Sequence, residues 1–229
     1  MIDDFEKYWL VRFSCGLDEV VGAEIRNEIV MGSEGLSDKS DRKAVIDWSK
    51  KAIGKLDELV DEEDRIAVMT SCTCQYPKSD LQEIRQKYEE TKSTDAVHKM
   101  LQDKFLSFLR DRLNLDNEVI GFILDKGMGL AGHKDASTII ATKIPKSGYI
   151  LEYLKEKDRL KKRALYCHCP RIRDALKTGT EISPTYCYCG AGYYKGIWEE
   201  ILQRPVKVEL LESVLKGDDA CKIAIHLSS

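Results

Sequence analysis

Six of the eight cysteines in this 229-residue chain form three Cys-x-Cys pairs, at 72 and 74, 167 and 169, and 187 and 189. In an extended segment, residues i and i+2 point the same way, so a pair of this kind can present both sulfurs to one metal ion. Zinc and iron–sulfur clusters both take about four soft ligands. The spacing therefore predicts a metal site formed by Cys167, Cys169, Cys187 and Cys189, with zinc favoured over an iron–sulfur cluster. The pair Cys72 and Cys74 is a further source of ligands, and buried, inert cysteines are the alternative.

Two of these cysteines are also expected at the starts of helices. Cys169 precedes Pro170, and proline is favoured at the first helical position, so Cys169 is predicted to be an N-cap. Cys189 is predicted to cap the next helix in the same way. The positive end of a helix lowers a thiol pKa, which helps both metal ligation and nucleophilic attack. Cys169 and Cys189 are therefore candidate catalytic nucleophiles. His168 is a candidate base or ligand, although in an extended segment it points away from its neighbours.

Aromatic residues cluster around the third pair and predict a binding pocket for a small apolar or aromatic molecule. The candidate ligand-binding residues are Tyr186, Tyr188, Tyr193, Tyr194 and Trp198, joined by Phe105 and Phe108 from earlier in the chain. Ordinary core packing is the alternative reading of the same residues.

Composition limits the possible classes of protein. With 43% hydrophobic and 33% charged residues, the chain can form a sizeable core. A net charge of −3 gives no reason to expect a nucleic-acid partner. The acidic start MIDDFEKYWLVRF does not resemble a signal peptide, and no apolar run approaches the roughly 18 residues of a membrane helix. We therefore expect no membrane partner and a cytoplasmic location, where thiols stay reduced.

The pattern of apolar residues predicts an α+β fold, with helices first and a small antiparallel sheet after them. Helices are expected at 5–13, 19–31, 41–59, 62–70, 81–90, 93–109 and 117–126. The later half is expected to contain a strand at 137–145, helices at 148–157, from Pro170 and at 190–203, and a hairpin at 206–227. This divides the chain into a helical region, 1–126, and an α+β region, 127–229, that together form one compact unit.

The stretch GAGYYKGIWEEILQRPVKVELLESVLKGDDACKIAIHL, at 190–227, resembles the 4-vinyl reductase family of domains. The resemblance lies in a glycine-bearing helix with Gly192 and Gly196, a strand that starts at Val206, and a Gly-Asp-x-x-Cys signature from Gly217 to Cys221. It implies an α+β fold, a role in binding hydrocarbon-like molecules, and a homodimer.

Some members of that family bind zinc through cysteines and a glutamate near the hairpin. Cys221 matches the last of those cysteines, whereas Ser213 and Leu210 stand where another cysteine and the glutamate would be. The resemblance thus implies Cys221 as a ligand, supplemented by the upstream cysteines, with Glu212 as a weaker candidate.

Three functions follow from these observations. The first is a cysteine-rich protein that binds a small apolar or aromatic molecule near a cysteine-ligated metal. The second is a hydrolase or other enzyme that uses a thiolate or a zinc-bound water. The third is a thiol-redox sensor.

Overall fold

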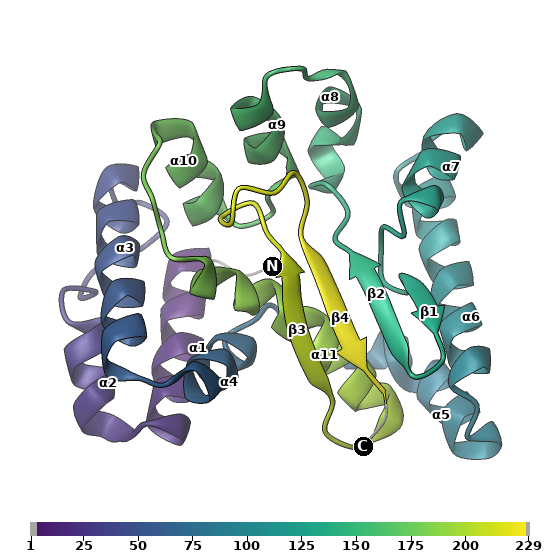
Figure 1. Cartoon of the computed structure of the whole chain (residues 1–229), viewed down its shortest axis with the longest axis horizontal. Coiled ribbons are helices and arrows are strands. Elements are labelled where there is room, and N and C mark those ends of the chain that lie inside the picture. Colours follow the sequence, from purple (N-terminus) through teal and green to yellow (C-terminus); the bar gives the residue numbers. More distant parts are fainter. Residues whose placement is uncertain (1–3, 228–229) are drawn as a thin grey trace.

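The computed structural model describes residues 4–227 (Figure 1). The first half is helical and contains α1 (Phe5–Val20), α2 (Gly22–Val30), α3 (Arg42–Leu59), α4 (Glu62–Ser71), η1 (Lys78–Leu81), α5 (Gln82–Thr91), α6 (Thr94–Ser107), the π-helix η2 (Phe108–Arg112) and α7 (Asn117–Asp125). Several helix starts are fixed by capping side chains. Asp41 accepts from the amide of Ala44 at 3.0 Å, and Asp61 and Ser93 cap α4 and α6 in the same manner.

The second half alternates short strands and helices. Its elements are β1 (His133–Asp135), β2 (Thr138–Thr142), η3 (Ser147–Tyr149), α8 (Ile150–Lys155), α9 (Arg159–Tyr166), α10 (Pro170–Thr178), η4 (Pro184–Cys187), α11 (Tyr188–Leu202), β3 (Lys207–Glu212) and β4 (Lys222–His226). The charged segment 155–163 is mostly exposed and contains the start of α9, which is capped by Asp158.

The four strands form one antiparallel sheet in the order β1-β2-β4-β3. The C-terminal hairpin is confirmed, with Val208 opposite Ile225. Strand β1 was not predicted, because its sequence follows a glycine-rich stretch that indicates only a loop. Gly132, at φ +63°, allows this turn, since a Cβ there would meet the backbone of Ile140 and Ala141 at 2.5–2.7 Å. The predicted α+β class is confirmed.

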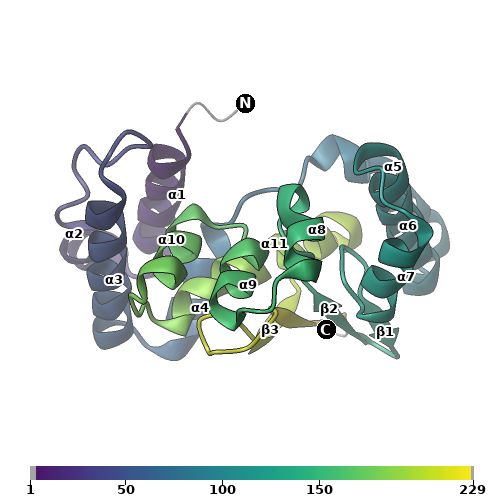
Figure 2. The same ribbon diagram turned by 90° about the horizontal axis from the view of Figure 1, so that it is seen from above.

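Figures 1 and 2 show how the helices surround the sheet. Helix α11 packs behind the sheet, α1–α4 lie beyond one edge, α5–α7 lie beyond the other, and α8–α10 lie at one end. Three buried clusters hold these parts together. Each cluster combines residues from both sides of position 126: Trp9 with Tyr186, Leu101 with Ile139, and Phe105 with Met128.

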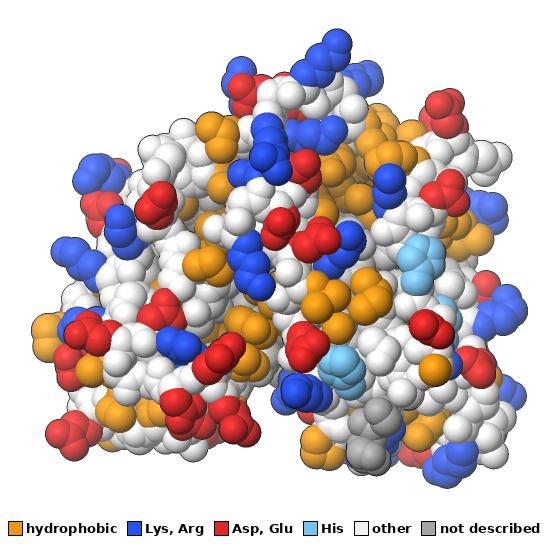
Figure 3. Space-filling view, in the orientation of Figure 1, with side chains coloured by type: hydrophobic (Ala, Val, Ile, Leu, Met, Phe, Trp, Pro, Cys, Tyr) orange, Lys and Arg blue, Asp and Glu red, His pale blue; other side chains and the backbone are white. Residues whose placement is uncertain are grey.

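The surface carries acidic and basic side chains interspersed over the face shown in Figure 3. Apolar side chains come to this surface between the helices and over the open face of the sheet. Within residues 4–227, none of the helices combines the length and the apolar character that crossing a membrane requires.

Gly192 sets the distance between α11 and α4. A Cβ on Gly192 would overlap the carbonyl oxygen of Thr70. The two helices therefore cross in direct backbone contact, with no side chain between them at this point. Gly196 lies one turn later on the same helix, is exposed, and has open space around it.

We therefore expect opposite effects from the same substitution at these two positions. Gly192→Ala should destabilise the fold by about 1–3 kcal/mol because α4 must move. Gly196→Ala should stabilise it by about 0.5–1 kcal/mol through helix propensity. Urea denaturation of both variants measures the two values, and a Gly192→Ala protein as stable as the wild type would contradict the close crossing.

A fully buried ion pair joins α1 to α10. The Arg171 Nε donates to Glu6 Oε2 at 2.6 Å, and Arg42 donates to Glu6 Oε1 at 2.7 Å. The guanidinium of Arg171 also lies 4.0 Å from the centre of the Trp9 ring. Because both charged groups are removed from water, the pair must remain complete.

Glu6→Gln should cost about 3–5 kcal/mol of unfolding free energy, since it leaves the Arg171 cation buried without its carboxylate. As a control, Asp103→Asn removes an exposed partner of Lys99, a contact of 3.1 Å, and should cost less than about 1 kcal/mol. The measurement is urea denaturation at neutral pH, and similar small losses in both variants would be inconsistent with this role of Glu6.

Candidate functional site

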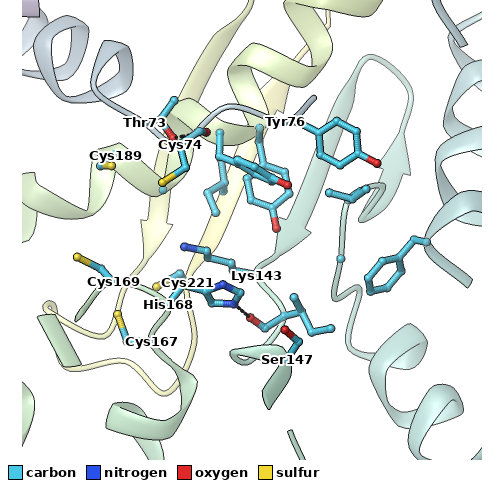
Figure 4. Close-up of a pocket in the computed structure, with 18 of the residues that line it drawn as sticks. Thr73, Cys74, Tyr76, Lys143, Ser147, Cys167, His168, Cys169, Cys189 and Cys221 are labelled. Atoms are coloured by element: carbon cyan, nitrogen blue, oxygen red, sulfur yellow. Dashed lines mark hydrogen bonds between the residues drawn. The ribbon is translucent and has the colours of Figure 1, made fainter. Parts of the chain in front are cut away.

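The main cavity of the described residues has a volume of about 640 Å³ and lies between α1, the α4–η1 connection, α6, η2, α10, α11 and the sheet. Its walls divide by chemistry into two sides. The thiol side consists of Cys74, Cys167, Cys169, Cys187, Cys189 and Cys221. The aromatic side consists of Tyr76, Phe105, Phe108, Tyr193 and Tyr194. Figure 4 shows the labelled sulfurs on one side, Tyr76 on the other, and Lys143 between them.

Sequence reasoning identified most of these residues. Six of the seven cysteines predicted as ligands line the thiol side, whereas Cys72 is buried and is not among the lining residues. Of the predicted aromatic residues, Tyr186, Tyr193 and Tyr194 line the cavity. Tyr188 and Trp198 are not among the lining residues, and Trp198 is fully buried in the core under the sheet.

The third Cys-x-Cys pair is helical, not extended. Cys187 ends η4 and is the N-cap of α11, which starts at Tyr188, so Cys189 lies inside the helix and does not cap it. Residues i and i+2 of a helix face different directions. The thiol of Cys187 therefore lies beside that of Cys221, whereas the thiol of Cys189 lies beside Cys72 and donates to its carbonyl oxygen at 3.9 Å. The Cys72 thiol itself donates to the carbonyl oxygen of Met69 at 3.2 Å. The expected presentation of both sulfurs to one ion is wrong for this pair.

These two contacts differentiate the thiols. The neighbouring Cys72 thiol, with help from the charge of Lys143, lowers the pKa of Cys189 to about 7. The neighbouring Cys187 thiol, again with help from Lys143, lowers the pKa of Cys221 to about 7. Burial raises the pKa of Cys72, whereas the contact with Cys221 is the main reason that the pKa of Cys187 is raised. Each pair thus combines one thiol with a raised pKa and one that more readily becomes a thiolate.

The second pair behaves differently. Cys169 is the N-cap of α10 with Pro170 in the first turn, as predicted. Its pKa is nevertheless raised, because burial outweighs its hydrogen bond with the Tyr186 hydroxyl at 3.3 Å. Burial also raises the pKa of Cys167 to about 12. The low pKa expected for Cys169 is therefore wrong, and the nucleophile candidates are Cys189 and Cys221.

His168 is a poor candidate for a general base. Its Nε2 lies 2.8 Å from the carbonyl oxygen of Ile144, to which it must donate. Burial, together with the charge of Lys143, lowers the pKa of His168 to about 4. The ring is neutral at pH 7 and has little tendency to take up a proton.

Lys143 is the cationic residue of the thiol side. Its backbone is fixed by strand-like contacts: its amide donates to the Cys221 carbonyl at 2.9 Å, and its carbonyl accepts from the Tyr166 hydroxyl at 2.6 Å. Burial alone would lower the pKa of Lys143, but the neighbouring cysteines, Cys167 and Cys221 foremost, outweigh it and raise the pKa above its ordinary value. The side chain is therefore an ammonium at neutral pH.

Among residues 4–227, no three Cys, His, Asp or Glu side chains are placed to share one metal ion. The thiols meet in pairs, with the Lys143 ammonium nearby. Glu212 is ion-paired with Lys222 at 2.8 Å and does not line the cavity. The donor set described here does not fit zinc or an iron–sulfur cluster without rearrangement, and a bound metal stays a prediction that elemental analysis of anaerobically purified protein can test.

The sequence did not indicate several of the lining residues, among them Trp9, Tyr76 and Lys143. Trp9 and Tyr76 come from the helical first half, far from the cysteines in sequence. Lys143 directly follows the β-branched residues of β2. A lysine at the end of a buried strand was the one sequence feature that could have indicated its place in the cavity.

Comparison with known proteins gives one match. Residues 143–229 match a family described as "Family of unknown function (DUF6144)". No curated protein and no solved structure matches the chain. The matched segment contains Lys143 and five of the six cysteines of the thiol side.

We expect two cysteines to be alkylated by iodoacetamide with a midpoint near pH 7. Cys189 and Cys221 should gain thiolate, and hence reactivity, as pH rises through about 7, whereas Cys167 should stay unreactive over the accessible range. Mass spectrometry of peptides after short labelling between pH 5.5 and 9.5 gives the profile of each site. Removing the neighbouring thiol with Cys72→Ala should move only the Cys189 midpoint upward. Midpoints above pH 9 at both sites would contradict this pairing of the thiols.

Proposed function

We propose that this protein binds a small apolar or aromatic molecule in the cavity between its aromatic side and its thiol side. The observation that carries the proposal is the cavity itself. Its volume of about 640 Å³ falls in the range of small-molecule sites, and its lining combines several aromatic rings with few charged groups.

The aromatic side offers faces and edges for stacking. Tyr193 lies 6.1 Å from Tyr76 and 5.8 Å from Tyr194, with the rings steeply inclined in both contacts. Phe105 and Phe108 are stacked 6.4 Å apart. Phe108 remains 39% exposed, so apolar ring surface is left for a ligand to cover. Covering such surface is favourable by about 25 cal/mol per Å².

The resemblance to the 4-vinyl reductase family supports the same function, because its members are described as hydrocarbon-binding. The homodimer that this resemblance implies is part of the proposal. We also propose a cytoplasmic location, since all eight cysteines are free thiols, as a reducing compartment would keep them.

A second candidate function is thiol chemistry on the bound molecule. It is favoured by the pKa of about 7 at Cys189 and Cys221, which both line the cavity. A thiolate beside a bound electrophile is the arrangement of a nucleophilic enzyme. Formation of a covalent adduct or turnover distinguishes this function from simple binding, and reversible oxidation of a thiol pair would indicate a redox sensor.

Binding is tested with Nile red, a neutral aromatic dye whose fluorescence rises in apolar surroundings. We expect saturable binding of one dye per chain. Tyr193→Leu removes an aromatic wall and should weaken binding by roughly threefold to tenfold. Tyr88→Leu is the matched control, since Tyr88 lies on α5 outside the lining residues and should bind as the wild type does. Equal losses in both variants, or no saturable binding, would refute the proposal.

A further inference from the structure

We propose that the cavity selects an amphipathic carboxylate, a molecule with an aromatic or apolar body and one carboxylate, which the Lys143 ammonium binds. This inference rests on the proposed function and names the chemical class of its ligand.

The first support is the placement of the Lys143 amine. Hydrogen bonds on both sides of its peptide unit direct this residue from the end of β2 into the cavity. Figure 4 shows the amine reaching between the labelled sulfurs. A Cβ on Gly190 would lie 3.6 Å from the Lys143 Nζ, so the small residue at this point of α11 leaves room beside the amine.

The second support is the start of α10. Its N-cap, Cys169, lines the thiol side. The N-terminus of this helix, with its partial positive charge, therefore lies at the same region as the ammonium. Both features favour a negative charge there.

The third support is that no carboxylate on the thiol side meets this positive charge. Among the described lining residues, the carboxylates are Asp80 and Asp111, which come from η1 and η2. The Lys143 Nζ forms no ion pair among the described residues, and the acidic groups that influence it are the cysteines. A ligand carboxylate would supply a charge-assisted hydrogen bond, while its apolar body would contact the aromatic side.

The thiolates of Cys189 and Cys221 are the competing source of negative charge. Both are mostly protonated at pH 6, whereas a ligand carboxylate is ionised there. Measurements at pH 6 therefore separate ligand binding to Lys143 from pairing with the thiolates.

The test compares 2-naphthylacetate with its neutral amide, 2-naphthylacetamide, by isothermal titration calorimetry at pH 6 on the full chain. The two probes share one apolar body and differ in charge. We expect the carboxylate to bind roughly tenfold more tightly, the effect of one charge-assisted hydrogen bond in a partly buried site. Lys143→Met should remove this preference and leave amide binding unchanged. Lys104→Met, which removes a lining lysine of α6, should retain it.

Each outcome is decisive. Equal affinity of the two probes for the wild type overturns the inference and leaves the proposed function intact. Binding of neither probe, together with failure to bind Nile red, overturns both. If Lys143→Met does not fold, as judged by circular dichroism, the wild-type comparison still decides, and Lys143→Arg provides the second variant because it should keep the preference. A preference that survives in a folded Lys143→Met protein also overturns the inference.

Discussion

The close crossing of α4 and α11 determines the arrangement of the thiols. Because Gly192 has no side chain, α11 approaches the Thr70 carbonyl of α4 without an intervening layer. Cys72 lies two residues beyond Thr70, and Cys189 lies three residues before Gly192, so the crossing brings these two sulfurs together. The contact with the Cys72 thiol then lowers the pKa of Cys189. The way these two helices pack therefore makes Cys189 more reactive than cysteines that look equivalent in the sequence.

Lys143 connects the electrostatics of both thiol pairs. The ammonium helps to lower the pKa of Cys189 and of Cys221, and the neighbouring cysteines in turn raise the pKa of Lys143. A ligand carboxylate and the two thiolates thus require the same counter-ion. Binding an anion at Lys143 would make each thiolate less favourable, so ligand binding and thiol reactivity are coupled through one side chain.

The sequence predicts those features that depend on interactions between residues close together in the chain. Capping by Asp41, Asp61 and Ser93, the proline that starts α10 and the alternation in the hairpin all act within a few residues. The pairing of sulfurs depends instead on which helices cross, and no local pattern encodes that. The i and i+2 spacing of Cys187 and Cys189 suits a metal chelate and therefore suggests an extended segment. In the structure, Ser183 and Pro184 start a helical turn that continues through these cysteines. Lys143 and Trp9 reach the cavity only through long-range packing.

The two thiol pairs differ in how much of the chain they require. Cys187 and Cys221 both lie in the segment that matches the family of unknown function, whereas the partner of Cys189 is Cys72 in the helical first half. The first half also provides Trp9, whose ring stacks on that of Tyr186 at 5.4 Å. The Arg171 guanidinium, which is paired with Glu6, also packs against the Trp9 ring. Tyr186 in turn contacts the Cys169 thiol. The complete site therefore depends on the buried ion pair and the helix crossing together, because each joins the first half of the chain to a different part of the thiol side.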